Sequence, residues 1–360
     1  MEWPRQSLIN LLNIQYPIVQ APMAGGPTTP ALVAAVSNAG GLGSIGSAYL
    51  TPEALRTAMR ETRALTDRPF AVNLFIPETV PEPGPHLPQM VERLSRYHAE
   101  LDLPAATVPN APTEAFAAQV AVMLEEGVPV FSFTFGMAEP DLITACHAIG
   151  AKVIGTATTV AEARLLEEHG VDAIAAQGAE AGGHRGTFNH THADALVGTI
   201  ALVPQIASAV SVPVIAMGGI MDGRGIAAAL ALGADGAGLG TAFLVAEEAG
   251  TNAPYRRAVL EAEETETQIT TAFSGKPARG IRNRFMEEIG ADPTTIPPYP
   301  WQNALTKSLR AGAAKADTPE YLSLWAGQGV GLTRELPASV LMETLVRETQ
   351  DVLSGLSAHG

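Results

Sequence analysis

The sequence has little cysteine, few aromatic residues and few basic ones. Of its 360 residues one is cysteine, 5% are aromatic, and 22 Lys and Arg stand against 37 Asp and Glu, for a net charge of −15. The single cysteine, Cys146, excludes a framework of intrachain disulfides, and its helix-like surroundings predict a packed thiol. The shortage of positive charge argues against a nucleic-acid partner or an anionic membrane surface.

Long apolar runs are also missing. No stretch free of Gly and Pro reaches membrane-spanning length, and residues 1–5 lack the profile of a secretory signal. The composition, 46% apolar and 16% charged, is typical of a compact enzyme-like globule. We therefore expect a cytoplasmic protein that acts on a small molecule and binds neither nucleic acid nor membrane, with a homodimer as the assembly to test.

Glycine and proline, in contrast, are frequent (35 and 27) and separate short apolar runs from helix-like segments. About eight strand–helix units fit between residues 17 and 247, which matches an α/β fold of the (β/α)8 TIM barrel type. A doubly wound sheet is the alternative, but Gly25-Gly26-Pro27 after the first strand is not its phosphate fingerprint. The strands are expected at 17–20, 41–45, 70–75, 128–133, 152–156, 171–174, 212–216 and 234–241.

Two regions do not follow this alternation of strands and helices. Residues 77–112 are rich in proline, contain one amphipathic helix at about 89–101, and are interpreted as an insertion between barrel units. Residues 249–360 have helical periodicity interrupted by prolines. We predict a barrel at 1–248 and an appended C-terminal helical subdomain at 249–360 that covers the active site. Barrel helices are expected at 30–39, 113–126, 161–168, 194–209 and 225–232, with another opening at Thr51-Pro52.

Two glycine clusters, Gly218-Gly219 and Gly238-Leu239-Gly240-Thr241, follow the last two expected strands. In TIM barrels the loops at these places often bind a phosphate through bare backbone N–H groups and a helix N-terminus. The pair of clusters therefore predicts a phosphate site. FMN fits such a site, with its phosphate at one edge and its flat ring over the barrel mouth.

The longest glycine-rich loop, residues 175–186, follows the expected strand at 171–174 and carries Gln177, Glu180, His184 and Arg185. Its glycines permit positive φ and a close approach of the backbone to a flat ligand. His184 can then face that ligand, and Glu180 is expected either to structure the loop or to act as a gate for the substrate.

Two other patterns do not lead us to predict a site. His190 and His192 could pair on a metal ion, but no third or fourth ligand is evident, so we predict no metal site. Lys152 lies on an expected strand, where aldolases keep a Schiff-base lysine, but the glycine loops favour a bound cofactor.

Several strings, in order along the chain, resemble the nitronate monooxygenase family, formerly called 2-nitropropane dioxygenases. The resemblance runs from about Ile14 to Leu309 and is weakest in the insertion and after about Thr318. The strings are Gln20-Ala21-Pro22-Met23, Asn73-Leu74-Phe75, residues 177–186, Gly218-Gly219-Ile220, Gly240-Thr241, residues 273–280, and Pro298-Tyr299-Pro300-Trp301-Gln302 with Lys307.

The resemblance implies a barrel that binds FMN without a covalent link. His184 would sit beside the reactive edge of the flavin as the catalytic residue. Ser274, Tyr299 and Lys307 are candidate residues of the pocket wall. The cofactor-binding residues would be Ala21, Pro22 and Met23 against the ring, Asn73, Gln177, Gly182 and Gly183 at the ring or ribityl chain, and Gly218, Gly219, Gly238, Leu239, Gly240 and Thr241 at the phosphate.

The reaction implied is the oxidation of an alkyl nitronate by O₂ to a carbonyl compound and nitrite. His184 would hydrogen-bond the nitro oxygens as an imidazolium, or take the α-proton of a neutral nitroalkane as an imidazole. Two other functions stay open. One is an NAD(P)H-dependent FMN reductase of the enoyl-acyl carrier protein reductase or quinone reductase type, and the other is a flavin- or phosphate-binding module without turnover.

Overall fold

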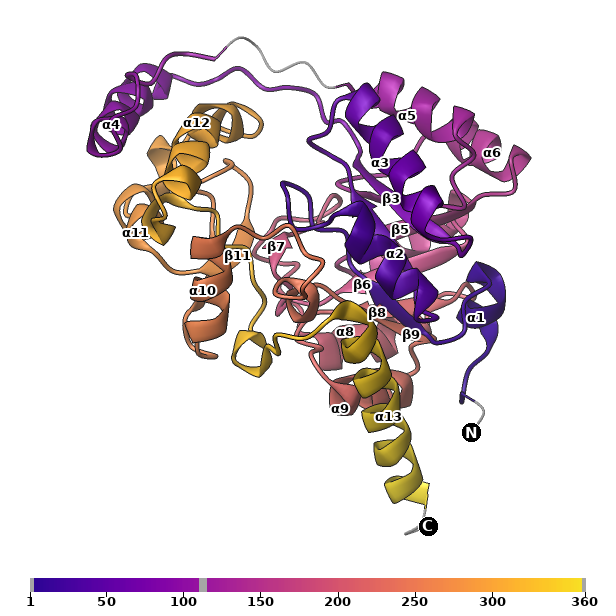
Figure 1. Cartoon of the computed structure of the whole chain (residues 1–360). Helices are drawn as coiled ribbons and strands as arrows, with labels where there is room; N and C mark the ends of the chain where they lie inside the picture. Colours follow the sequence, from indigo (N-terminus) through magenta and orange to yellow (C-terminus); the bar gives the residue numbers. More distant parts are fainter. Residues whose placement is uncertain (1–2, 110–114, 358–360) are drawn as a thin grey trace.

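Eight parallel strands form a closed barrel at the centre of the molecule, a computed structural model that describes residues 3–109 and 115–357 (Figure 1). Leu42 closes the ring between the first two strands, because it donates to the Ile18 carbonyl (3.0 Å) and accepts from the Gln20 N–H (2.9 Å). The predicted TIM barrel is therefore confirmed. In spatial order the strands are β1 (Ile18–Gln20), β9 (Gly236–Leu239), β8 (Val214–Met217), β6 (Ala173–Gln177), β5 (Lys152–Ala157), β4 (Val130–Thr134), β3 (Phe70–Phe75) and β2 (Gly43–Gly46).

Helices cover the outside of the barrel and form the largest apolar core with its strands. A separate core fills the barrel interior, where Leu8 and Leu12 of α1 (Ser7–Leu12) close the amino ends of the strands. Thr51 caps α3 as predicted, since its hydroxyl accepts from the Ala54 N–H at 3.2 Å. The outer helices are α2 (Pro30–Asn38), α3 (Pro52–Leu65), α5 (Phe116–Glu125), α6 (Pro140–Ala148), α7 (Val160–Glu168), α8 (Thr199–Ala207), α9 (Gly223–Ala231) and α13 (Ala338–Ser357).

The start of one helix differs clearly from the expected one. The expected helix at 194–209 begins at Thr199, because the preceding Gly198 takes an extended conformation and Glu180 accepts from the Thr199 N–H. The expected start at Thr113 lies outside the described residues. Within the described part of the chain, no helix combines the length and the apolar character that a membrane crossing requires.

The region after β9 is less helical than its sequence indicates. It contains β10 (Thr267–Thr270) and β11 (Ala278–Ile281). These form a three-stranded sheet with β7 (Gly183–His184), which lies in the glycine-rich loop at residues 175–186, called the central loop below. The purely helical description is therefore incomplete. The helices of this region are α10 (Ala253–Glu261), α11 (Arg284–Gly290) and α12 (Trp301–Lys315), with 3₁₀ turns at Thr241–Phe243, Pro293–Thr295, Pro319–Tyr321 and Val330–Leu332.

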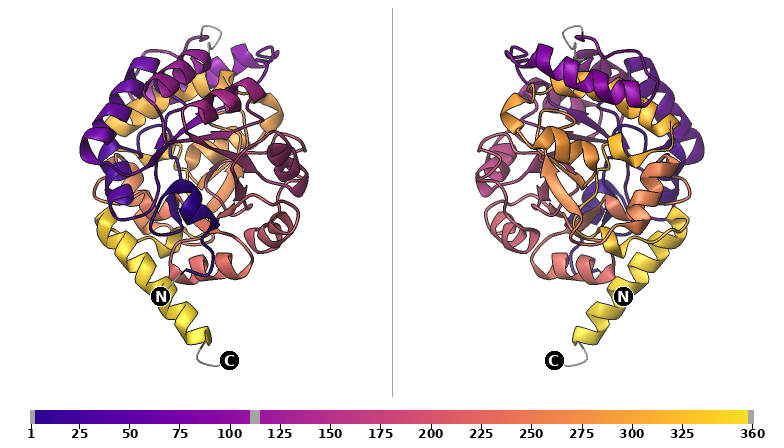
Figure 2. Two further views of the ribbon diagram at one scale, coloured as in Figure 1. Left: turned by 90° about the vertical axis from the view of Figure 1, so that its right-hand side faces the viewer. Right: turned by 90° about the vertical axis from the view of Figure 1, so that its left-hand side faces the viewer.

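Helix α13 returns to the barrel after this region. It packs against α9 and α2, so it occupies the last helix position of the barrel, and its far end projects beyond the body (Figure 2). Residues 249–337 thus form a cover segment that lies between the last strand and the last helix of the barrel. The division at residue 248 stays a prediction.

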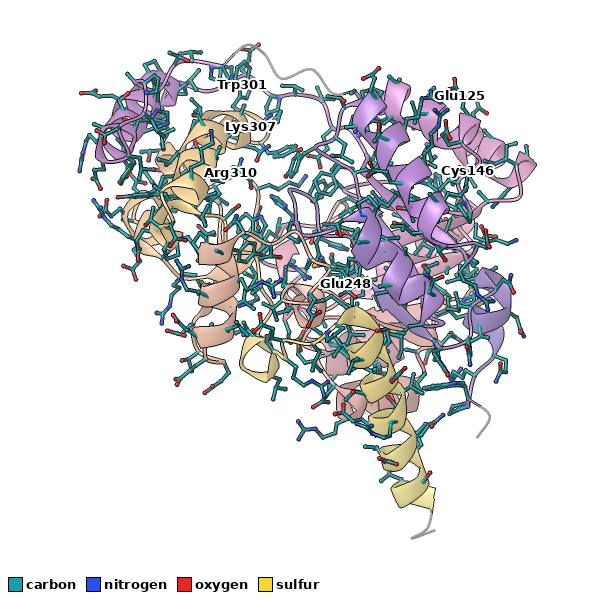
Figure 3. The ribbon with its side chains drawn as sticks, in the orientation of Figure 1. Glu125, Cys146, Glu248, Trp301, Lys307 and Arg310 are labelled. Carbon is teal, nitrogen blue, oxygen red and sulfur yellow. The ribbon has the colours of Figure 1, made fainter. Side chains whose placement is uncertain are left out.

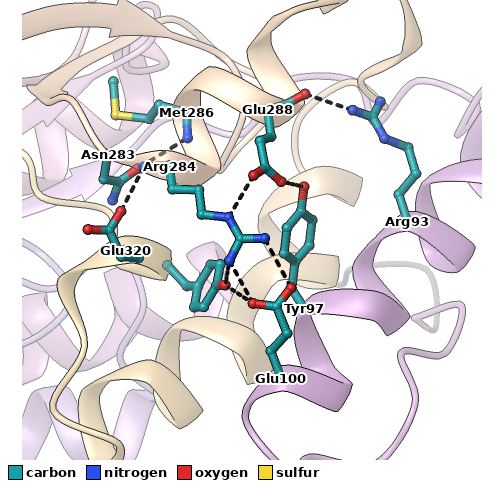
Figure 4. Close-up of polar contacts among 9 residues, drawn as sticks. Arg93, Tyr97, Glu100, Asn283, Arg284, Met286, Glu288 and Glu320 are labelled. Carbon is teal, nitrogen blue, oxygen red and sulfur yellow. Dashed lines mark hydrogen bonds and ion pairs between the residues drawn. The ribbon is translucent and has the colours of Figure 1, made fainter.

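The proline-rich insertion is attached to the cover segment. Its helix α4 (Leu87–Glu100) lies beside α11 and α12, where Arg284 binds Glu100 (2.6 Å) and Glu288 (2.6 Å), and the Tyr97 hydroxyl also donates to Glu288 (2.7 Å) (Figure 4). Leu94 and Tyr97 join the apolar core of the cover segment. The insertion therefore packs against the cover segment rather than against the outer helices of the barrel.

Candidate active site

A cavity of about 810 Å³ lies between the carboxyl ends of the barrel strands and the cover segment. Residues from the barrel strands, from the central loop and from α12 all contribute to its wall. Its volume is in the usual range for sites that bind a cofactor or a drug-sized ligand, about 300–1,000 Å³. The carboxyl face is also where TIM barrels place their active sites.

Most of the predicted site residues lie in the wall of this one cavity. Leu239 does not, because its side chain is fully buried against the outer helices, and its carbonyl accepts from the Ala21 N–H. Ser274 is buried behind the wall. The residues brought together are Ala21, Pro22, Met23, Asn73, Gln177, Gly182, Gly183, His184, Gly218, Gly219, Gly238, Gly240, Thr241, Tyr299 and Lys307.

His184 lies in the cavity wall among aromatic side chains. Its ring lies 5.5 Å from Trp325, 5.7 Å from Phe135 and 6.1 Å from Phe75, between ring centroids, and its Nε2 contacts the Ser274 hydroxyl at 2.9 Å. Burial, with the positive charges of Lys276 and Arg310, lowers the pKa of His184 to about 3. The side chain is therefore a neutral imidazole at neutral pH and not the imidazolium, which is the other form that the sequence analysis considers.

This pKa predicts a pH dependence of stability. An unfolded histidine titrates near 6.5, so below that pH the unfolded chain binds a proton that folded His184 does not. Stability should fall as the pH drops from about 6.5 towards 3, by up to ~1.4 kcal/mol per pH unit for this one group, and stay constant above 6.5.

Urea unfolding of the parent and of His184→Gln at pH 7 and pH 5.5 checks this. The parent should lose more stability between the two pH values than the variant, which shares every other titratable group. An equal loss in both proteins would mean that His184 is protonated in the folded state.

The loop that carries His184 is held by its own polar residues. The Gln177 amide donates to the His184 carbonyl (2.9 Å) and accepts from the Gly186 N–H (2.8 Å). Arg185 is 2% exposed and donates to the carbonyls of Gly178, Gln177 and Ala195. Glu180 accepts from the N–H and the hydroxyl of Thr199, as expected of a loop-structuring residue.

The glycine clusters expose backbone to the cavity. A Cβ added at Gly240 would meet only the Ala21 Cβ, at 3.7 Å, whereas one at Gly219 would meet the Glu180 Cβ at 3.3 Å. The N–H groups of Gly219 and Gly240 make no hydrogen bond to another described residue. Backbone N–H groups that face a cavity without a partner can bind the oxygens of a phosphate. Gly219 and Gly240 therefore fit the predicted phosphate end of FMN. Gly182, by contrast, is required by packing, since a Cβ there would meet the Ala326 backbone at 2.5 Å.

Several residues in the cavity wall or directly behind it are not among the predicted site residues. Phe135 and Trp325 enclose His184, and Arg310 of α12 lines the cavity near it. A polar side chain near the carboxyl end of an apolar strand can indicate a residue of the cavity wall, because alternate strand residues face the barrel interior. Asn73 is a predicted site residue of this kind, and Ser44, Ser132, Thr134 and Thr156 follow the same pattern and also line the cavity.

The residues for which no catalytic role is predicted lie away from the cavity. Cys146 is buried on α6, away from the cavity, and burial raises its pKa to about 11 (Figure 3). Lys152 starts β5 at the amino end of the barrel. Within residues 3–109 and 115–357, no group of three or more His, Cys, Asp or Glu is arranged to hold a metal ion.

The closed barrel and its cavity place the chain among the TIM-barrel enzymes, whose active sites lie at the carboxyl ends of the strands. Comparison with known families narrows that class. The model of the nitronate monooxygenase family matches residues 5–348, and the chain belongs to this family of oxidoreductases.

Individual relatives agree over nearly the full length. The chain is 43% identical over 352 residues to a probable nitronate monooxygenase of Staphylococcus aureus (strain Newman), covering 98% of this chain and 99% of that protein. It is similar to the crystal structure of a nitroalkane oxidase from Streptomyces ansochromogenes (TM-score 0.91, 41% identity, 97% and 99% covered). It also resembles FabK from Thermotoga maritima (TM-score 0.78, 32% identity, 100% of both chains covered).

Proposed function

We propose that the protein binds FMN in this cavity and oxidises alkyl nitronates with O₂ to carbonyl compounds and nitrite. The open backbone of Gly219 and Gly240 would hold the phosphate, and Ala21, Met23 and Asn73 would border the ring. When bound, the flavin supplies the electron-accepting and O₂-reducing chemistry that no side chain provides. Family membership and the similarity to a nitroalkane oxidase support this assignment.

The observation that carries the proposal is the neutral imidazole of His184 in the cavity wall. With Nε2 beside the Ser274 hydroxyl, the ring is held in one orientation among aromatic side chains. The Ser274 hydroxyl donates to the Lys276 carbonyl (3.0 Å), so it can accept from an Nε2–H and leave Nδ1 unprotonated. An unprotonated imidazole nitrogen can accept the α-proton of a neutral nitroalkane, and the wall around it limits water.

The first test of this function is the cofactor. The purified protein should be yellow and release FMN, not FAD, on denaturation, because the glycine clusters form one phosphate-sized site. Absorption spectra and chromatography of the released flavin measure this. A colourless protein that takes up no added FMN would overturn the cofactor assignment.

A second candidate function is NAD(P)H-dependent reduction by the same FMN barrel, which the full-length similarity to FabK favours. Two assays separate the two functions: nitrite release from a nitronate with O₂, and steady-state consumption of NADH. Nitrite release without NADH consumption is the result expected. NADH consumption without nitrite release would replace nitronate oxidation by the reductase function.

A further inference from the structure

A nitronate is an anion, and the folded protein must hold its negative charge in a cavity with limited water. An unpaired charge taken out of water is strongly destabilised. His184 does not supply the counter-charge, since its pKa is lowered to about 3. The basic side chains of the cover segment near the cavity are Lys276, Lys307 and Arg310.

Two of these three cations are poorly placed for the task. The Lys276 ammonium is already paired with Glu78 at 2.6 Å and lies over the Phe135 ring, 4.0 Å from its centroid. Lys307 lines the cavity but is exposed on α12, where water solvates its charge. A hydrated ammonium on a flexible stem is a weaker anchor than a fixed guanidinium.

Arg310 differs from both. It lies one helical turn after Lys307 on α12, lines the cavity and is half-buried (Figure 3). Its Nη2 donates to the backbone carbonyl (2.9 Å) and the side-chain oxygen (2.8 Å) of Asn303, which fixes the guanidinium. Among the described residues, no carboxylate lies within 4.0 Å of it, and its Nη1 makes no hydrogen bond.

The charge of Arg310 acts on the same space as the imidazole. It lowers the pKa of His184. It also opposes the rise in the pKa of the Tyr49 hydroxyl that burial causes, so the guanidinium lies close to both groups. Burial lowers the pKa of Arg310 itself, but an arginine stays protonated in proteins. A fixed positive charge without a carboxylate partner therefore lies in the cavity of a chain whose net charge is −15.

We propose that Arg310 determines specificity for the anionic form of the substrate by binding the nitronate oxygens, an inference that rests on the proposed function. The two N–H bonds of Nη1 have no acceptor among the described residues, and a nitronate carries its charge on two oxygens of one nitrogen. Because Nη2 and Nε already bond to Asn303 and Thr306, Nη1 is the group that can donate a charge-assisted hydrogen bond to a nitronate oxygen.

This role predicts a particular kinetic signature. Oxidation removes the negative charge of the substrate, so Arg310 stabilises the bound nitronate at least as much as the transition state. An interaction of that kind affects KM and leaves kcat nearly unchanged. Replacing the base His184, in contrast, should lower kcat.

The test compares Arg310→Gln, Arg310→Lys and the control Lys315→Gln, which removes one exposed charge from the last turn of the same helix. For ethylnitronate, Arg310→Gln should raise KM by roughly tenfold or more with kcat within about threefold, and Arg310→Lys, which keeps the charge but not the fixed guanidinium, should restore only part of the loss. Lys315→Gln should behave like the parent. An unchanged KM in a folded, FMN-loaded Arg310→Gln protein would overturn the proposal.

A second measurement does not depend on turnover. Isothermal titration calorimetry of the protein as purified with nitrate, a planar anion with oxygens on one nitrogen, should show binding that Arg310→Gln weakens by roughly tenfold. Unchanged nitrate affinity in that variant would overturn the anion site. If the parent oxidises no nitronate but loses nitrate binding in Arg310→Gln, the proposed function fails while the anion site stands.

Discussion

His184→Asn should lower kcat/KM for alkyl nitronates by roughly ten- to a hundredfold, because the shorter asparagine no longer fills the space of the imidazole that is proposed to position the substrate, and such a misplacement can cost about a hundredfold. The loss should be larger for neutral nitroalkanes, since asparagine cannot accept the α-proton. FMN content should not change, because the glycine clusters are untouched. Nitrite release from matched nitronate and nitroalkane solutions measures both effects.

A matched control is available in His147→Asn. His147 is an exposed histidine of α6 that pairs with Asp172 at 2.9 Å, and it does not line the cavity. This variant should keep parental rates on both substrate forms. Parental activity of His184→Asn on both forms would remove His184 from the mechanism.

Gly240→Asp should abolish FMN binding at working concentrations while the barrel stays folded. The new side chain fits sterically, since the Cβ would meet only Ala21 and the backbone has φ −105°. Its carboxylate would lie where the phosphate is proposed to bind, and like charges a few ångströms apart repel by on the order of a few kcal/mol. The Kd for FMN should therefore rise by roughly a hundredfold or more.

Gly240→Asn separates charge from shape in this experiment, because asparagine has nearly the volume of aspartate without its charge. It should weaken FMN binding far less. Fluorescence titration of the flavin-free variants gives the two dissociation constants, and circular dichroism checks the fold. If both variants bind FMN as the parent does, the phosphate lies elsewhere in the cavity.

The barrel could be predicted from sequence because its signals are local. The strand at 70–75 has the predicted bounds, since Pro69 precedes it and its residues are apolar except for Asn73. Leu239 shows the limit of that method. Successive strand residues face opposite sides of a sheet, so Gly238 faces the cavity while Leu239 faces the outer helices.

The cover segment could not be predicted to the same extent, because its contacts join residues far apart in the chain. The short strand β7 exists only by pairing with β11, where His184 lies opposite Ala278. The polar run Thr267–Thr270 carries no alternating apolar pattern that would indicate β10. Arg310 lies on an amphipathic helix, where a basic residue normally indicates the solvent face.

The place of the cover segment between β9 and α13 limits how the cavity can open. A domain joined by one linker can swing freely, whereas residues 249–337 are attached to the barrel at both ends. Such a segment can rotate only about the line through its two attachment points, with small backbone changes at each. Opening should then be a narrow rocking motion, and Arg310 would keep its approach to the bound substrate through each turnover.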